Sequence, residues 1–245
     1  MHPVPVLFYG VPQGCSFGSI VALEWLGQPY RLCRIEMLDH PWPAAYAAIN
    51  PLNQTPALLL EEGEALSESL AILLNIGTRG IARGLGFYQG TPEADRLNEV
   101  LAYLNSDFFA AFGPLWAAYE MQDADEATRA VLQRIGNAGV AKALAHVEAL
   151  LGRRPWLAGA QRTVADAYFA GVARWAEYFP QFDLALDYPN LRHHLDRLRA
   201  DPAVQFAMAI EAGEPATSSG RCLGHVMLDA LHEQRARLGR EGVPA

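Results

Sequence analysis

Lysine, cysteine and long apolar runs are scarce in this chain of 245 residues, and each scarcity excludes a class of protein. Lys142 is the single lysine, the arginines are dispersed, and the formal net charge is −8. An acidic chain without a basic cluster argues against nucleic acid as the main partner. No apolar run approaches the roughly 18 residues that cross a bilayer, so we expect no membrane segment.

The three cysteines, Cys15, Cys33 and Cys222, are an odd number and lie far apart in the chain. This usage suits reduced thiols in a cytosol better than a disulfide framework. No Cys-x-x-Cys pair or other ligand spacing points to a metal. Because the N-terminus lacks a basic stretch followed by an apolar one, we expect a cytoplasmic protein and not a secreted one.

The length and the pattern of apolar residues predict two domains. The first, residues 1–79, reads as strand, helix, strand, helix, strand, strand, helix, which is a thioredoxin-like α/β order. The strands are expected at residues 4–9, 30–36, 57–60 and 64–65. Residues 77–90 hold five glycines without periodicity and are interpreted as the linker between the domains.

The second domain, residues 91–245, is predicted to be all-helical. Thr91 and Pro92 have the residue types of a helix cap and a first helical residue. The long helix that follows should be interrupted near Gly113-Pro114, and a second should span residues 126–151. A Thr-x-x-Asp box opens the third, and further helices should follow Pro189 and Pro202.

Residues 50–76 hold the strongest functional signal. Thr55-Pro56 precedes a short apolar strand, and an X-Pro bond is the only peptide bond that adopts the cis form at little cost. A cis bond here would turn the backbone of Thr55 outward, where it could pair with an extended peptide. Glu68 and Ser69 open the following helix, whose free amides favour a carboxylate. The segment therefore offers a peptide-pairing edge beside a carboxylate pocket.

These residues resemble the glutathione site of the glutathione S-transferase superfamily. The resemblance implies that Thr55, before the cis-Pro56, pairs with the backbone of the tripeptide's cysteine, and that Glu68 and Ser69 hold its γ-glutamyl end. The similarity runs from about residue 4 to residue 213. It includes the box Thr163–Asp166, whose role in that family is structural, so we expect backbone amides to occupy the Asp166 carboxylate.

The stretch from Tyr9 to Ser16 resembles the bacterial beta class of this superfamily, in which a cysteine contacts the glutathione sulfur. Cys15 therefore becomes the expected catalytic residue. At a helix N-terminus, free amides should lower the pKa of its thiol. A small buried cysteine without chemistry is the alternative reading. Ser16 is the backup catalytic candidate, and strand alternation makes Tyr9 a core residue.

Other positions complete the expected substrate sites. Gln54 is expected to bond the glycyl end of glutathione or to shape the loop before Thr55. His40 is assigned to the glycyl carboxylate, although beta-class members usually carry a lysine at its position. Asp107 matches an acidic residue that reaches the partner subunit's glutathione in related dimers, with a solvated helix face as the competing interpretation. An apolar wall for the second substrate is expected from side chains on the long helix, which core packing could equally explain: Phe108, Phe109, Phe112 and Trp116.

The resemblance implies a homodimeric glutathione transferase-like enzyme with glutathione as co-substrate and no metal. Conjugation to small apolar electrophiles is expected to be weak, and Cys15 makes thiol–disulfide or peroxide reduction plausible. A non-catalytic glutathione-binding or regulatory protein on the same fold is the alternative.

A tail beginning near residue 213 extends past the usual end of the family's helical domain. Residues 213–220 are a linker by composition. Residues 222–238 have helical apolar spacing, and the hypothesis is a helix that covers the aromatic site as a lid. Packing on the outer face of the domain, packing across the dimer, or disorder are the alternatives.

Overall fold

The computed structural model describes residues 4–231 except residues 12, 13, 40, 122 and 124. The prediction for His40 and the distal part of the expected tail helix lie outside the described residues. Among the described helices, none is long and apolar enough to cross a membrane.

A mixed sheet forms the N-terminal part, with the strand order β4-β3-β1-β2-β5. β1 pairs in parallel with β2 and antiparallel with β3, and β3 pairs antiparallel with β4. The strand bounds are β1 Val6–Val11, β2 Tyr30–Glu36, β3 Ala57–Leu59, β4 Ala65–Ser67 and β5 Cys222–His225. The first four strands and their helices follow the predicted thioredoxin-like order.

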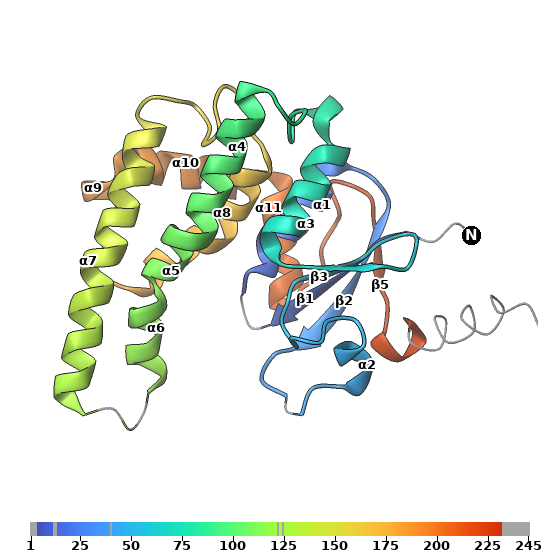
Figure 1. The fold of residues 1–245 in the computed structure, drawn as a ribbon, viewed down its shortest axis with the longest axis horizontal. Helices are drawn as coiled ribbons and strands as arrows, with labels where there is room; N and C mark the ends of the chain where they lie inside the picture. The colour runs from blue at the N-terminus through green and yellow to red at the C-terminus, as the bar shows by residue number, and fades with distance from the viewer. Residues whose placement is uncertain (1–3, 12–13, 40, 122, 124, 232–245) are drawn as a thin grey trace, which may run out of the picture.

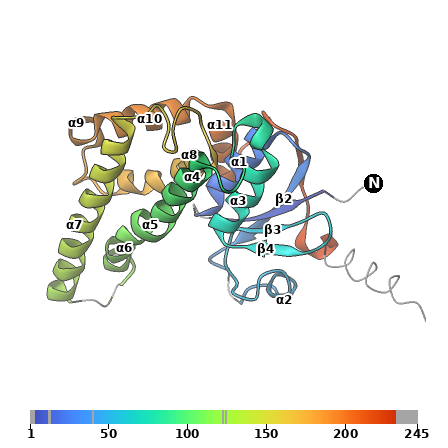
Figure 2. The same cartoon turned by 45° about the horizontal axis from the view of Figure 1, so that its top comes forward.

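Helices α1 (Ser16–Leu26) and α3 (Ser69–Arg79) cover one face of this sheet, and α2 (Ala44–Ala47) lies near the other (Figures 1 and 2). Every residue of α1 is buried. The helix packs against the sheet, α3, α8 (Val164–Val172) and α11 (Pro202–Ala212), so it has no solvent face and its sequence shows little amphipathicity.

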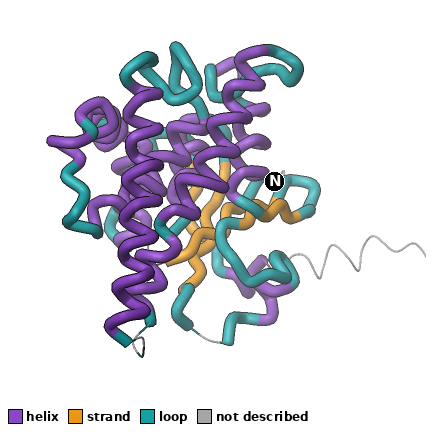
Figure 3. Tube along the Cα trace, turned by 60° about the vertical axis from the view of Figure 1, so that its left-hand side comes forward, coloured by secondary structure: helices purple, strands orange, loops and turns teal. Residues whose placement is uncertain are grey.

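The C-terminal part is a layer of helices, seen in front of the sheet in Figure 3. Helix α4 begins with the predicted cap: the Thr91 hydroxyl accepts a hydrogen bond from the amide of Ala94, and Pro92 is the first helical residue. Helix α7 has the predicted bounds. The remaining bounds are α4 Pro92–Tyr103, α6 Gly113–Glu120, α7 Glu126–Leu151, α9 Leu184–Asp187 and α10 Pro189–Arg199, with 3₁₀ segments η1 Ile81–Arg83 and η3 Ala173–Tyr178.

The predicted interruption of the long helix is present, but it begins before Gly113. Helix α4 passes into a π-helical turn, η2 (Leu104–Phe108), then into the short α5 (Phe109–Ala111) and α6. Pro114 falls in the first turn of α6, where a residue without an amide proton costs no hydrogen bond. Such π-helical turns often occur at functional sites.

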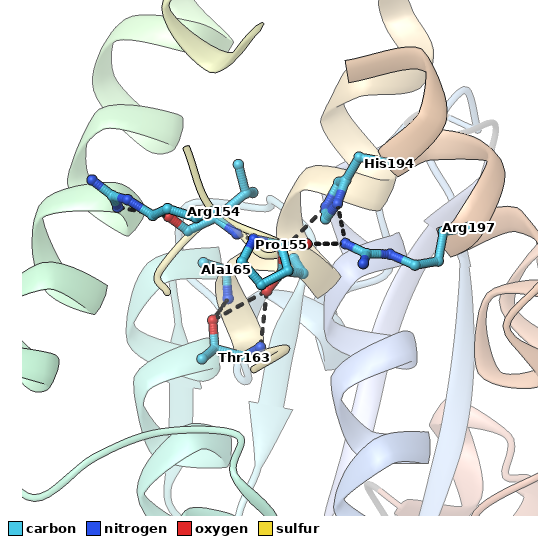
Figure 4. A network of polar contacts seen from close by, with 8 residues as sticks. Arg154, Pro155, Thr163, Ala165, His194 and Arg197 are labelled. Carbon is cyan, nitrogen blue, oxygen red and sulfur yellow. Dashed lines mark hydrogen bonds and ion pairs between the residues drawn. The ribbon is translucent and has the colours of Figure 1, made fainter. Parts of the chain in front are cut away.

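The Thr163–Asp166 box closes as predicted. Asp166 accepts hydrogen bonds from the amides of Thr163 at 2.9 Å and Leu157 at 3.0 Å. His194 Nε2 lies 3.1 Å from Asp166 Oδ1. Figure 4 shows Thr163 and His194 on either side of this network, with Arg197 beside His194. The carboxylate is fully buried and occupied, which confirms its structural role.

Helix α8, opened by this box, packs directly on α1. A Cβ atom on Gly18 would lie 2.7 Å from the Cα of Tyr168, so the approach of the two helices requires glycine at this position. The segment between α3 and α4 packs against the start of α8. Leu85 in this segment is fully buried, and its carbonyl accepts a hydrogen bond from the amide of Val164. The N-terminus of α1 is thereby held against the helical layer.

The predicted tail helix does not begin at residue 222; among the described residues of the tail, only 228–231 are helical. Cys222–His225 is instead strand β5, which pairs in parallel with β2. Leu231 is buried in the cluster that contains Phe8 of β1 and Tyr46 of α2. In Figure 1 this part of the tail lies beside the sheet, far from α5 and α6. For its described residues, the lid hypothesis is therefore wrong, because an open strand edge offered unpaired backbone groups that β5 satisfies.

Candidate functional site

The Thr55-Pro56 bond is cis, as predicted. The Gln54 carbonyl accepts hydrogen bonds from the Tyr46 hydroxyl at 2.6 Å and the Asn50 amide at 2.8 Å, which hold the chain just before it. Within the described residues, the backbone N–H and C=O of Thr55 make no hydrogen bond. Since backbone groups of this kind are normally paired, Thr55 presents the free peptide edge that the sequence predicted. The Gln54 side chain is exposed.

Glu68 and Ser69 lie at the N-terminus of α3. Glu68 is the N-cap residue, with a φ of 71°, a region that residues other than glycine rarely adopt. Its side chain is not used to cap the helix. Backbone strain of this kind is concentrated at binding and catalytic sites. Ser69 is buried in the first turn, so the pair offers a free carboxylate above a helix N-terminus.

Cys15 is the N-cap residue of α1 and is partly buried. The expected lowering of its pKa is wrong in direction. Burial, with a further contribution from the nearby Glu68 carboxylate, raises the pKa of the Cys15 thiol to about 11. Desolvation of the thiolate therefore outweighs the helix N-terminus. In the unliganded protein at neutral pH, Cys15 is a protonated S–H group that can donate a hydrogen bond.

Tyr168, on α8, is a site residue that the sequence did not reveal. Burial raises the pKa of its phenol, and Cys15 and Glu68 both add to the shift, so the three groups lie near one another. The Tyr168 hydroxyl donates to Asn105 Oδ1 at 3.1 Å. Asn105 comes from the π-helical turn η2, which therefore projects a polar group toward the site. The position of Tyr168, two residues after Asp166 and near the start of α8, was the sequence feature that could have drawn attention to it.

Ser16 and Tyr9 have structural contacts. The Ser16 hydroxyl is fully buried and accepts a hydrogen bond from the amide of Gly10 at 3.1 Å. This contact ties the first turn of α1 to β1, and a catalytic role for Ser16 stays a prediction that the contact does not favour. Tyr9 is buried, as expected, and its hydroxyl lies 2.8 Å from His225 Nε2 on β5.

The aromatic wall is only partly as expected. Phe108 and Phe112 are fully buried and belong to the core, so their assignment to the second substrate is wrong. They occupy the inner face of the helix because their spacing of four residues keeps both on one side. Phe109 and Trp116 are partly exposed and both pack on Trp175, with ring centroids 4.8 Å and 5.7 Å away. Trp175, which was not assigned, is the centre of this aromatic cluster.

Asp107 is exposed on the π-helical turn η2, and the Ser106 hydroxyl donates to its carboxylate at 2.6 Å. Its predicted contact with a partner subunit's glutathione remains a prediction. Among the described residues, no group of three or more His, Cys, Asp or Glu side chains could hold a metal ion.

Known protein families match the same parts of the chain. The model for the glutathione S-transferase N-terminal domain matches residues 15–79, and the model for the C-terminal domain matches residues 117–197. A sphingomonad glutathione S-transferase complexed with glutathione is 30% identical with a TM-score of 0.74, and the match covers 84% of this chain and 98% of that one. This protein belongs to the glutathione S-transferase family.

Two further bacterial glutathione transferases are similar to most of this chain. Glutathione S-transferase GstA of Escherichia coli O157:H7 is 29% identical over 210 residues, which cover 84% of this chain and 98% of the relative. The bacterial beta class enzyme of Sphingomonas chungbukensis is 27% identical with a TM-score of 0.72, covering 84% of this chain and 98% of that chain. About a sixth of this transferase-family chain has no counterpart in either relative.

Proposed function

We propose that this protein is a glutathione-dependent transferase that joins the glutathione sulfur to small apolar electrophiles. The protonated Cys15 thiol donates a hydrogen bond to the glutathione thiolate. The observation that carries the proposal is the raised pKa of Cys15 beside Glu68, together with the free backbone of Thr55. A group that remains protonated at neutral pH stabilises a neighbouring anion better than it attacks an electrophile.

Glutathione would lie extended along the residues around the cis bond. The Thr55 N–H and C=O pair with the backbone of its cysteine, as in β-strand addition. The Glu68 carboxylate binds the γ-glutamyl ammonium, and Ser69 with the amides at the start of α3 takes the γ-glutamyl carboxylate. Gln54 and His40 are proposed for the glycyl end.

In the reaction, the thiol of glutathione loses its proton to solvent, and the resulting thiolate is held by the S–H of Cys15. Its electron pair forms a carbon–sulfur bond with the electrophile, while a leaving group departs with the electrons of the bond that breaks. Cys15 is neither oxidised nor alkylated in this cycle. Phe109 and Trp116, with Trp175, supply the apolar surface for the electrophile.

Thiol–disulfide or peroxide reduction through Cys15 is the second candidate function. It needs a Cys15 thiolate as the nucleophile. With a pKa of about 11, only about one Cys15 in ten thousand is ionised at pH 7. The raised pKa of Cys15 therefore supports a hydrogen-bond donor and disfavours disulfide or peroxide reduction. The sequence alone favoured reduction over conjugation, and the proposal reverses that preference.

A cytoplasmic homodimer is part of the proposal. The reduced, widely spaced cysteines support a cytosolic setting. The exposed Asp107 on η2 supports a dimer in which each subunit's Asp107 reaches the glutathione of the other.

Binding to immobilised glutathione, followed by turnover of a chromogenic apolar electrophile, tests the proposed function. Retention and elution by free glutathione, with turnover that saturates in both substrates, is the expected result. Retention without turnover would indicate a non-catalytic glutathione-binding protein and contradict the proposed activity. Failure of retention would remove the assignment of the site.

A further inference from the structure

The last turn of α11 lies beside Gly14, the residue just before Cys15. Glu211 lies in this turn, and the backbone N–H of Gly14 is among the groups that lower the pKa of its carboxyl, so the two lie near each other. The Glu211 side chain is only 3% exposed. Helix α11 therefore reaches from the helical layer to the chain immediately before the thiol.

Arg174 fixes this carboxylate and the start of α1 at the same time. Its Nη1 lies 2.9 Å from Glu211 Oε2, and its Nε donates to the Gly171 carbonyl at the end of α8 at 3.1 Å. The guanidinium stacks 3.7 Å above the ring of Phe17, two residues after Cys15. The Arg174–Glu211 pair thus packs on the first turn of α1, just after Cys15, and lies near the backbone just before it.

A buried ion pair is an expensive way to stabilise a protein. Removing two charges from water costs several kcal/mol per ion, and well-packed apolar residues often serve as well. Burial raises the pKa of the Glu211 carboxyl because removing its charge from water is unfavourable, and Arg174 opposes this shift. The carboxylate is needed at this point because Arg174, stacked on Phe17 and only 14% exposed, would otherwise be a buried cation without its partner.

The geometry points to Glu211 and Arg174 as positioning residues for Cys15. The inference rests on the proposed function, since it concerns how the thiol is aimed at the glutathione sulfur. Neither residue touches the substrate or the reacting atoms. Glu211 pairs with Arg174, Arg174 stacks on Phe17, and together they keep the first turn of α1, and with it the partly buried Cys15, in place. A shift of the loop would lose this geometry, and misplacement of about 1 Å can cost a hundredfold in rate.

The test compares three substitutions in the full chain. Glu211→Ala removes the carboxylate partner of Arg174. Glu211→Gln keeps a carbonyl oxygen in its place and serves as the conservative variant. Glu61→Gln is the matched control, because it alters another acid–arginine pair, Glu61 in the turn between β3 and β4 with Arg79 on α3 at 2.6 Å.

Alkylation of each cysteine by iodoacetamide is followed by mass spectrometry, a readout that needs no glutathione and so is independent of the proposed function. Fully buried Cys33 reports global unfolding. We expect Glu211→Ala to label Cys15 about tenfold faster with Cys33 still protected, because a released loop exposes the thiol. Glu211→Gln and Glu61→Gln should stay within about threefold of the parent.

Turnover then separates a positioning role from a structural one. If the proposed conjugation is observed, Glu211→Ala should lower kcat about tenfold with a smaller change in the KM for glutathione. Unchanged Cys15 labelling in Glu211→Ala would overturn the inference. Labelling of Cys15 and Cys33 that rises in parallel would also overturn it, and so would an equal defect in Glu61→Gln. If Glu211→Ala does not fold, Arg174→Lys provides the same comparison, since it keeps the charge and removes the stack on Phe17.

Discussion

The Ser218 hydroxyl donates to both oxygens of the Glu24 carboxylate, at 2.8 Å and 2.9 Å, and so joins the C-terminal tail to the first helix. The same buried carboxylate accepts from the Tyr30 hydroxyl at 2.6 Å and from the Gly220 amide at 2.6 Å. Strand β5 begins two residues later. The tail is therefore anchored first at α1 and then along β2, which gives this family member a fifth strand.

Replacing Glu24 by Ala should destabilise the protein by about 2–4 kcal/mol, because the buried Tyr30 hydroxyl and several donors of the tail lose their acceptor. Urea unfolding monitored by circular dichroism measures the change. Ser219→Ala, which removes a single 3.1 Å hydrogen bond to Glu24, is the control and should cost about 1 kcal/mol. Equal effects of the two substitutions would contradict the anchoring role of Glu24.

The pH dependence of Cys15 alkylation follows from its raised pKa. The thiol is protonated below its pKa, and the thiolate is the form that reacts. Since burial and Glu68 hold the pKa near 11, the rate should rise about tenfold per pH unit from pH 7 to about pH 10, without a plateau. A plateau at or below pH 8 in the unliganded protein would show a thiolate already formed and contradict the hydrogen-bond donor.

Removing the Glu68 carboxylate should weaken glutathione binding. Glu68→Gln takes away a charged partner of the γ-glutamyl ammonium, and such a bond is worth about 1.5–3 kcal/mol, or roughly tenfold or more in Kd. Calorimetry with glutathione gives the value. Glu62→Gln is the matched control, because Glu62 is an exposed acid in the nearby turn and should bind as the parent does. Unchanged affinity in Glu68→Gln would remove the site assignment.

Phe112 and Phe109 should behave differently although both lie on the same helical segment. Phe112 is fully buried, so Phe112→Ala should cost about 3–5 kcal/mol of stability. Phe109 is partly exposed and packs on Trp175, so Phe109→Ala should raise the KM for the electrophile with a smaller loss of stability. Thermal unfolding and steady-state kinetics on both variants check the pair. A Phe112→Ala variant that keeps its stability but has a raised KM for the electrophile would show that Phe112 contacts the substrate.

The sequence predicted features that depend on neighbours along the chain. The cis bond at Pro56, the cap at Thr91 and the box at Asp166 each arise from local backbone chemistry. The errors concern burial and pairing between distant segments. The pKa of Cys15 depends on how deeply α1 is packed, and the helical spacing of the tail was overridden by the open edge of β2.

The aromatic site shows the same limit. Spacing placed Phe108, Phe109 and Phe112 on one helix, but which of them faces the core depends on α8 and η3 packing against it. Tyr168 and Trp175 could not be assigned for the same reason, since their proximity to Cys15 and Phe109 exists only in the folded chain.

The central claim is that Cys15 acts as a hydrogen-bond donor to the glutathione thiolate. It is tested most directly by kcat/KM for conjugation in Cys15→Ser and Cys15→Ala. Serine keeps a donor, so Cys15→Ser should stay within about threefold of the parent, whereas Cys15→Ala should lose about tenfold or more, the equivalent of one hydrogen bond to a charged group. Equal loss in both variants would show that the thiol itself reacts, and full activity in both would show that Cys15 has no part in the chemistry.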